Sequence, residues 1–143
     1  MEQGKTSAAI AHFHTAVGLE PDFSGAHYNL AFAFGATGRL QDAIREYRQA
    51  LRDDPGFAEA HANLGQLLGS QGKLDEAIPH LREAVRLMPE SAEALNNLGA
   101  GLWLQGQRNE AISSFRRALE LDPQHAGARR NLDAASKQTA AIR

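Results

Sequence analysis

Apolar residues recur along most of the chain with the spacing of an amphipathic helix. In the stretch 58–91, Leu64, Leu67 and Leu68 stand at positions i, i+3 and i+4, which places them on one helical face. After Gly72, the same spacing returns in a second set: Ala77, Ile78, Leu81, Ala84 and Val85. Glycine suits a left-handed helix end, and proline cannot continue a helix. The pattern therefore predicts a helix, a tight turn at Gly72 and a second helix.

This helix-turn-helix pattern repeats at a fixed interval of 34 residues. Four residue types mark the interval: Pro21, Pro55, Pro89 and Pro123; Gly4, Gly38, Gly72 and Gly106; Ala9, Ala43, Ala77 and Ala111; and Asn29, Asn63, Asn97 and Asn131. A fixed period of this size indicates stacked units that share one continuous core. We divide the single domain 1–143 into a partial unit 1–23, the units 24–57, 58–91 and 92–125, and a closing segment 126–143.

The two ends of this row differ in character. The partial unit supplies only a second helix, over about residues 6–19. Its apolar face consists of Ile10, Phe13 and Val17. We expect that face to lack a partner on one side, so either the chain is a fragment of a longer array or another copy covers the face in a homo-oligomer. Arg129 and Asp133 give the closing helix a polar outer face, which is typical of a capping helix.

Two stretches carry a recognisable motif: NLGQLLGSQGKLDEAIPHLREAVRLMP at 63–89 and NLGAGLWLQGQRNEAISSFRRALELDP at 97–123. Their small, bulky and proline positions resemble the tetratricopeptide repeat family, in particular bacterial members and the protein O-linked N-acetylglucosamine transferases. The resemblance covers nearly the whole chain. It implies an all-α, right-handed superhelical solenoid of antiparallel helix pairs, with the first helices on the concave side. His27, His61 and Leu95 depart from the family, which often has Trp there.

The composition disfavours two classes of function, nucleic-acid binding and membrane insertion. The formal net charge is -2 with 22% charged residues, which disfavours a nucleic-acid binder because such proteins carry a basic patch. No apolar run approaches the roughly 20 residues that cross a bilayer, and the N-terminal sequence lacks the pattern of a signal peptide. We therefore expect a cytoplasmic protein without membrane insertion. The absence of cysteine excludes disulfides and thiol chemistry.

The resemblance implies a set of candidate binding residues on the concave face. They are Tyr28, Asn29, Phe32, Glu59, Asn63, Gln66, Glu93, Asn96, Asn97, Trp103, Arg130 and Asn131. A ladder of asparagines suits an extended polypeptide, because each carboxamide can pair with a peptide N–H and C=O. In relatives, equivalent asparagines hold a peptide backbone. The alternative is that these asparagines tie neighbouring helices together.

Two aromatic residues can also be interpreted in two ways. Phe32 and Trp103 are either exposed anchors in the groove or ordinary core residues. The helical phase of Trp103 matches that of Asn96 and Ala100, which favours the groove.

The sequence argues against one binding mode of the family. Chaperone adaptors grip a C-terminal carboxylate with Lys and Arg on the first and third units. Those positions hold Tyr28, Phe32 and Glu93 in one frame, and Ala62, Gln66 and Gly127 in the next. We therefore expect no carboxylate clamp. Glu59 and Glu93 favour a neutral or basic segment in the middle, and Arg130 favours an acidic group near the C-terminal end.

The sequence gives little support for a metal site or for catalysis. His27 and His61 lie one unit apart near helix contacts, while His12 and His80 lie two units apart, and none forms a His-x-x-x-His pair. The nucleophile, zinc-protease and phosphate-loop motifs are all absent. We expect no metal, no cofactor and no enzymatic activity.

The sequence thus predicts a protein-interaction scaffold that binds a polypeptide segment in its concave groove. Two alternatives remain. The repeats could recruit substrate for a larger enzyme such as a glycosyltransferase, or they could mediate homo-oligomer assembly through the N-terminal helix.

Overall fold

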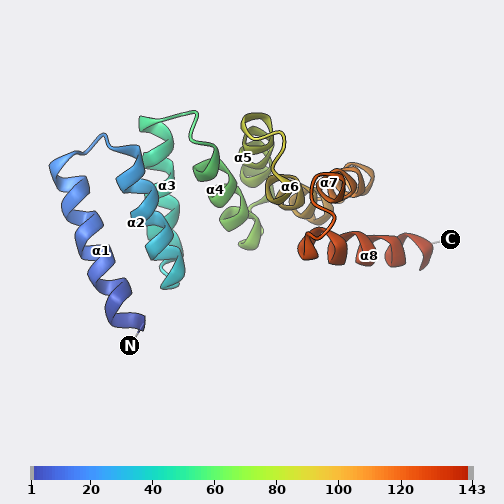
Figure 1. The fold of residues 1–143 in the computed structure, drawn as a ribbon, viewed down its shortest axis with the longest axis horizontal. Coiled ribbons are helices and arrows are strands. Elements are labelled where there is room, and N and C mark those ends of the chain that lie inside the picture. The colour runs from blue at the N-terminus through green and yellow to red at the C-terminus, as the bar shows by residue number, and fades with distance from the viewer. Residues whose placement is uncertain (1, 142–143) are drawn as a thin grey trace.

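The computed structural model describes the backbone of residues 2–141 and the side chains of residues 7–138. Within that part of the chain the backbone forms eight helices: α1 (Glu2–Leu19), α2 (Ser24–Ala36), α3 (Leu40–Asp53), α4 (Ala58–Ser70), α5 (Leu74–Leu87), α6 (Ala92–Leu104), α7 (Arg108–Leu121) and α8 (Ala126–Ala141). They stack into an elongated row, along which the helix axes turn progressively from α1 to α8 (Figure 1). The predicted all-α solenoid of helix pairs is confirmed.

The contacts between helices determine how the row bends. Each helix makes its extensive contacts with helices one or two places away along the chain, most of all within the pairs α2–α3, α4–α5 and α6–α7. The first helices α4 and α6, and α6 and α8, also contact one another, whereas the second helices of neighbouring pairs make no comparable backbone contact. The row therefore curves around α2, α4, α6 and α8, which form its concave side.

Glycine ends the first helix of each pair. Gly38, Gly72 and Gly106 have φ values of +75°, +74° and +86°, a left-handed conformation that other residues adopt only with strain. The next residue closes each turn, as where the Arg39 N–H donates to the Phe34 carbonyl at 2.9 Å. The predicted tight turns are thus confirmed.

Glycine also permits the two helices of a pair to approach closely. A Cβ built at Gly65 would lie 2.7 Å from Cγ of Leu81, and one at Gly99 would lie 2.6 Å from the ring of Phe115. Both contacts are shorter than van der Waals distance, so glycine is required for this packing. The hydrophobic core lies along these contacts between paired helices. Its largest fully buried side chains are Phe34, Phe115, Leu30, Leu64, Leu68, Leu81 and Leu102.

The outer helices are joined by ion pairs between neighbouring units. Arg48 of α3 bonds Glu76 of α5 at 2.6 Å, and Arg82 of α5 bonds Glu110 of α7 at 2.6 Å. All four side chains are largely exposed, so each pair contributes at most about 1 kcal/mol to stability.

At the ends of the row, the structure places the predicted residues as follows. α1 begins at Glu2, earlier than the predicted residue 6, and its Ile10, Phe13 and Val17 pack partly buried against the core. On α8, the buried face contains Ala128 and Ala135. Arg129 and Asp133 are exposed. Within residues 2–141, no helix has both the length and the apolar character of a membrane span.

Candidate functional site

The candidate residues on the concave side differ in accessibility. Exposed are Asn29, Phe32, Glu59, Gln66, Glu93 and Arg130, whereas Tyr28, Asn63, Asn97, Trp103 and Asn131 are partly buried. Asn96 is buried, with 8% of its surface accessible. The structure therefore divides the predicted set into groups that a ligand can reach to different extents.

The asparagine ladder consists of two kinds of residue. The Asn63 carboxamide donates to the Tyr28 hydroxyl at 3.0 Å, and the Asn131 carboxamide donates to Oδ1 of Asn96 at 2.9 Å. Both bonds join neighbouring first helices, so these two asparagines tie helices together.

Asn97 lacks such a bond because Ala62 stands at the position that would have to supply the oxygen. Tyr28 and Asn96 supply the partner oxygens of the two helix-tying bonds, but the equivalent residue beside Asn97 is Ala62, whose methyl group cannot hydrogen-bond. Among the described residues, the Asn97 side chain makes no hydrogen bond, and it is partly accessible. Its carboxamide can therefore pair with an external donor and acceptor.

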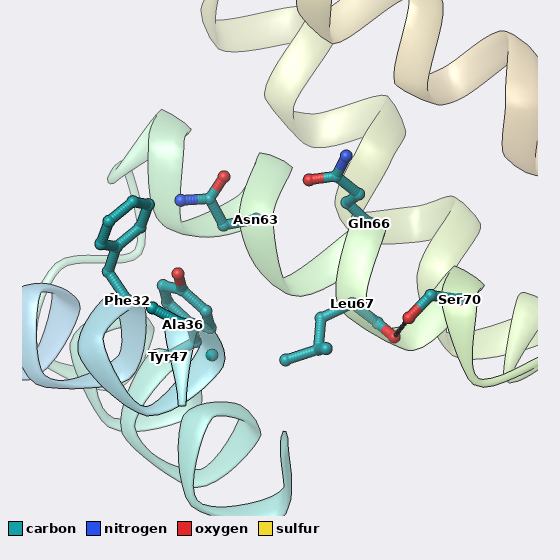
Figure 2. Close-up of a pocket in the computed structure, with 8 residues that line it drawn as sticks. Phe32, Ala36, Tyr47, Asn63, Gln66, Leu67 and Ser70 are labelled. Carbon is teal, nitrogen blue, oxygen red and sulfur yellow. Dashed lines mark hydrogen bonds between the residues drawn. The ribbon is translucent and has the colours of Figure 1, made fainter. Parts of the chain in front are cut away.

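A pocket of about 390 Å³ lies between α2 and α4. It is lined by Phe32, Gly35, Ala36, Tyr47, Asn63, Gln66, Leu67 and Ser70. Phe32, Ala36 and Tyr47 lie on one side of it, and Asn63, Gln66, Leu67 and Ser70 on the other (Figure 2). The lining is mainly apolar, with carboxamides beside it, and the Phe32 ring is 61% exposed. Such a pocket can hold an apolar group while its polar groups orient an attached amide.

A smaller pocket of about 140 Å³ lies between α4 and α6. Its lining consists of Gly65, Gln66, Gly69, Ser70, Leu81, Asn97, Ala100, Gly101 and Leu104. Asn97 with its unpaired carboxamide is thus part of this pocket. Leu104, which is 64% exposed, borders it. This pocket was not predicted from the sequence, although the small residues Gly65, Gly69 and Gly101 were a signal for it.

Tyr28 and Tyr47 belong to an aromatic cluster beneath the first pocket. The Tyr28 ring stacks on Phe57 at 4.8 Å and lies 5.8 Å from Tyr47. Burial raises the pKa of the Tyr47 hydroxyl to about 12, and Tyr28 adds to the shift. The hydroxyl therefore stays protonated at neutral pH. Tyr28 contributes more to this packing and to its bond with Asn63 than to open surface.

Trp103 is packed more closely than the groove interpretation assumed. It is partly buried against the core cluster, and the Arg108 guanidinium lies 5.5 Å from its ring centre. The predicted aromatic anchors thus differ, because the Phe32 ring is open to solvent and the Trp103 ring is largely covered.

The charged candidate residues differ in whether their side chains have an interaction partner. Glu59 is exposed and forms no ion pair among the described residues. The Glu93 carboxylate accepts a hydrogen bond of 2.8 Å from Nε2 of His125. Arg130 is exposed on α8. A ligand can therefore pair with Glu59 without displacing a partner, whereas at Glu93 it competes with His125.

The structure brings together two pairs of side chains that were not predicted from the sequence. Nδ1 of His61 lies 2.9 Å from Nδ1 of His80, and Nδ1 of His27 lies 2.8 Å from Glu46. Both pairs join the two helices of one unit across 19 residues, and this shared spacing was the available signal. Burial and the neighbouring His61 lower the pKa of His80. Among the described residues, no three acidic or histidine side chains converge as a metal site would require.

Comparisons with known proteins agree with this architecture. Two sequence profiles described as tetratricopeptide repeat match the chain, over residues 1–67 and 56–124. No curated protein sequence matches significantly.

Solved structures show the same fold. MamA from Desulfovibrio magneticus RS-1 matches with a TM-score of 0.89 at 21% identity, over 97% of this chain and 78% of that one. YrrB, described as a TPR protein with an unusual peptide-binding site, matches with a TM-score of 0.83 at 25% identity, over 97% and 72%. The first TPR of Spaghetti (RPAP3), bound to the HSP90 peptide SRMEEVD, matches with a TM-score of 0.79 at 22% identity, over 82% and 94%. Period, fold and profiles agree that the chain belongs to the tetratricopeptide repeat family.

Proposed function

We propose that this chain is a non-catalytic protein-interaction scaffold that binds an extended polypeptide segment along α2, α4, α6 and α8. The observation that carries the proposal is the open apolar pocket between α2 and α4, with the solvent-exposed Phe32 ring and the carboxamides of Asn63 and Gln66 in its lining. An apolar recess beside amide groups fits a polypeptide, which offers apolar side chains on a hydrogen-bonding backbone. The peptide-binding site named for YrrB and the peptide bound to the first TPR of Spaghetti support the proposal by analogy.

The middle of the groove supplies the backbone contact in this proposal. The Asn97 carboxamide would donate to a peptide carbonyl and accept from a peptide N–H. Because its hydrogen bonds are not used within the described part of the protein, ligand binding does not have to break an existing one.

The charges around the groove favour a neutral or basic ligand. Helix α2 has no Lys, Arg, Asp or Glu, and α4 and α6 contribute one acidic residue each, Glu59 and Glu93. An acidic tail would meet no cation on these three helices, so we do not expect the chain to hold a C-terminal carboxylate.

The first test is a peptide-display screen on the purified chain, repeated with Phe32→Ala. We expect enriched peptides whose affinity falls at least about tenfold in the variant, since a buried apolar contact is lost. Phe23→Ala is the matched control, because Phe23 is similarly exposed at 53% but does not line either groove pocket. No enrichment, or equal affinity for Phe32→Ala and the unmodified chain, would refute binding at this pocket.

A further inference from the structure

The two groove pockets are the same structural feature in successive units. Each of the eight residues that line the larger pocket has a counterpart 34 positions later in the lining of the smaller one. Gly35, Asn63 and Ser70, for example, correspond to Gly69, Asn97 and Leu104. The pockets therefore lie in register along the concave side, and Gln66 and Ser70 belong to both. We call them the first slot (α2–α4) and the second slot (α4–α6).

Glycine keeps both slots open. A Cβ at Gly35 would meet no atom within 4 Å, and one at Gly69 would meet only Cβ of Ala77 at 3.9 Å. A side chain would fit sterically at either position, so close helix packing does not explain these two glycines. At Gly65 and Gly99, in contrast, a Cβ would overlap the second helix.

The third unit has a different residue at this position. Trp103 stands 34 residues after Gly69, and its ring packs partly buried against the core with the Arg108 guanidinium 5.5 Å from its centre. The glycine that borders the slots in the two preceding units is therefore replaced by a bulky indole between α6 and α8.

We propose that the two open slots bind two apolar side chains of one extended, neutral or basic segment, and that Trp103 ends the row of slots. This inference rests on the proposed function and specifies its ligand. The slots recur once per unit, and the first helices α4 and α6 contact each other, as helices packed about 8–10 Å apart do. A polyproline-II chain advances about 3.1 Å per residue with three residues per turn, so its side chains i and i+3 point the same way about 9 Å apart. The slots thus match apolar residues at i and i+3.

Size and charge refine this ligand. The first slot holds about 390 Å³ and the second about 140 Å³, so the larger side chain belongs at the α2–α4 end. Even the second slot has room for one apolar group, since a cavity of about 150 Å³ can hold benzene. Glu59, which is exposed and has no ion-pair partner among the described residues, lies on α4, the helix shared by both slots, and favours a Lys or Arg in the segment over an Asp or Glu.

The test uses fluorescently labelled peptides with a Gly/Ser/Lys background and the full chain. One peptide carries Leu at i and i+3, a second carries Leu at i and i+1, and a third carries a single Leu. We expect the i, i+3 peptide to bind about tenfold tighter than the other two. In Gly69→Trp, which copies the natural residue of the third unit, all three peptides should bind with similar affinity.

Controls separate the slots from effects on folding. Gly69→Ala should retain most of the preference, and Gly35→Trp, at a position with open space, should weaken all three peptides. Thermal melting checks that each variant is folded. If the peptides bind and Phe32→Ala weakens them, but spacing has no effect or Gly69→Trp retains the i, i+3 preference, the two-slot proposal is wrong and the proposed function stands. If none of the peptides binds, both fail.

Discussion

The carboxamide of Asn63 donates to the hydroxyl of Tyr28 across neighbouring helices at 3.0 Å, whereas the counterpart of Tyr28 in the next unit is Ala62, which offers Asn97 no hydrogen-bonding group. The same sequence position thus holds a structural asparagine in one unit and an unpaired one in the next. The identity of the residue one helix away determines which role each asparagine has.

This difference predicts opposite phenotypes for two alanine substitutions. Asn63→Ala should lower the free energy of unfolding by about 1 kcal/mol, because it removes an intramolecular hydrogen bond. Asn97→Ala should leave stability within about 0.5 kcal/mol and weaken peptide binding. Urea unfolding and fluorescence binding measure the two effects. Unchanged peptide affinity of Asn97→Ala would exclude this carboxamide from the binding site.

The converse substitution restores the missing bond. Ala62→Asn copies the arrangement of Asn96 with Asn131, so we expect the new carboxamide to bond Asn97 and to raise stability by about 1 kcal/mol. Peptide affinity should fall, because the Asn97 carboxamide is then engaged. Ala62→Ser, whose side chain is too short to reproduce the Asn96 geometry, is the control. Tighter peptide binding by Ala62→Asn would contradict the assignment.

Two glycines on α4 should respond to alanine in opposite directions. Gly65→Ala places a methyl group 2.7 Å from Cγ of Leu81 and 3.2 Å from the Ala77 carbonyl, so we expect a loss of about 1–3 kcal/mol. Gly69→Ala meets only Cβ of Ala77 at 3.9 Å and should gain about 0.5 kcal/mol from higher helix propensity. Urea midpoints monitored by circular dichroism compare the two. A gain in both variants would show that helix propensity outweighs close packing at Gly65, and a loss in both would contradict the open space at Gly69.

Mild acid should destabilise the unit that contains the histidine pair. Nε2 of His61 donates to the Pro55 carbonyl at 2.9 Å, which leaves Nδ1 of His61 as an acceptor. The contact between the two rings is then a hydrogen bond from Nδ1–H of His80 to Nδ1 of His61. Burial, His61 and Arg48 lower the pKa of His80 in the folded state, and Glu76 opposes them. Glu83 also faces His61.

The unfolded chain therefore binds more protons as the pH falls below the unshifted value of 6.5. Stability is fully present above that pH and falls below it, by up to about 1.4 kcal/mol per pH unit for one proton. Unfolding free energies at pH 7.5 and pH 5 measure the effect. His80→Gln should reduce the difference between the two values, whereas His12→Gln, on the exposed face of α1, should not. An identical pH dependence in His80→Gln would refute the role of the pair.

The sequence was sufficient to predict the helices and their stacking, because helical periodicity and the glycine turns are local properties. Asn63 and Asn97 look alike in sequence, and only the packing of neighbouring first helices shows that Tyr28 engages one and Ala62 leaves the other unpaired. Trp103 shared the helical phase of groove residues, but its ring folds onto the core. The His61–His80 pair depends on the geometry between two helices, which a search for closely spaced ligands does not detect.

The restriction of extensive helix contacts to near neighbours has a kinetic consequence. Within residues 2–141, no contact between the first and last helices has to form before the core can assemble, so the relative contact order is low and the entropy lost on closing loops is small. Folding can begin in any adjacent pair of helices and propagate along the row. The terminal helices α1 and α8, which line neither slot, can open while the three pairs between them, which carry both slots, stay folded.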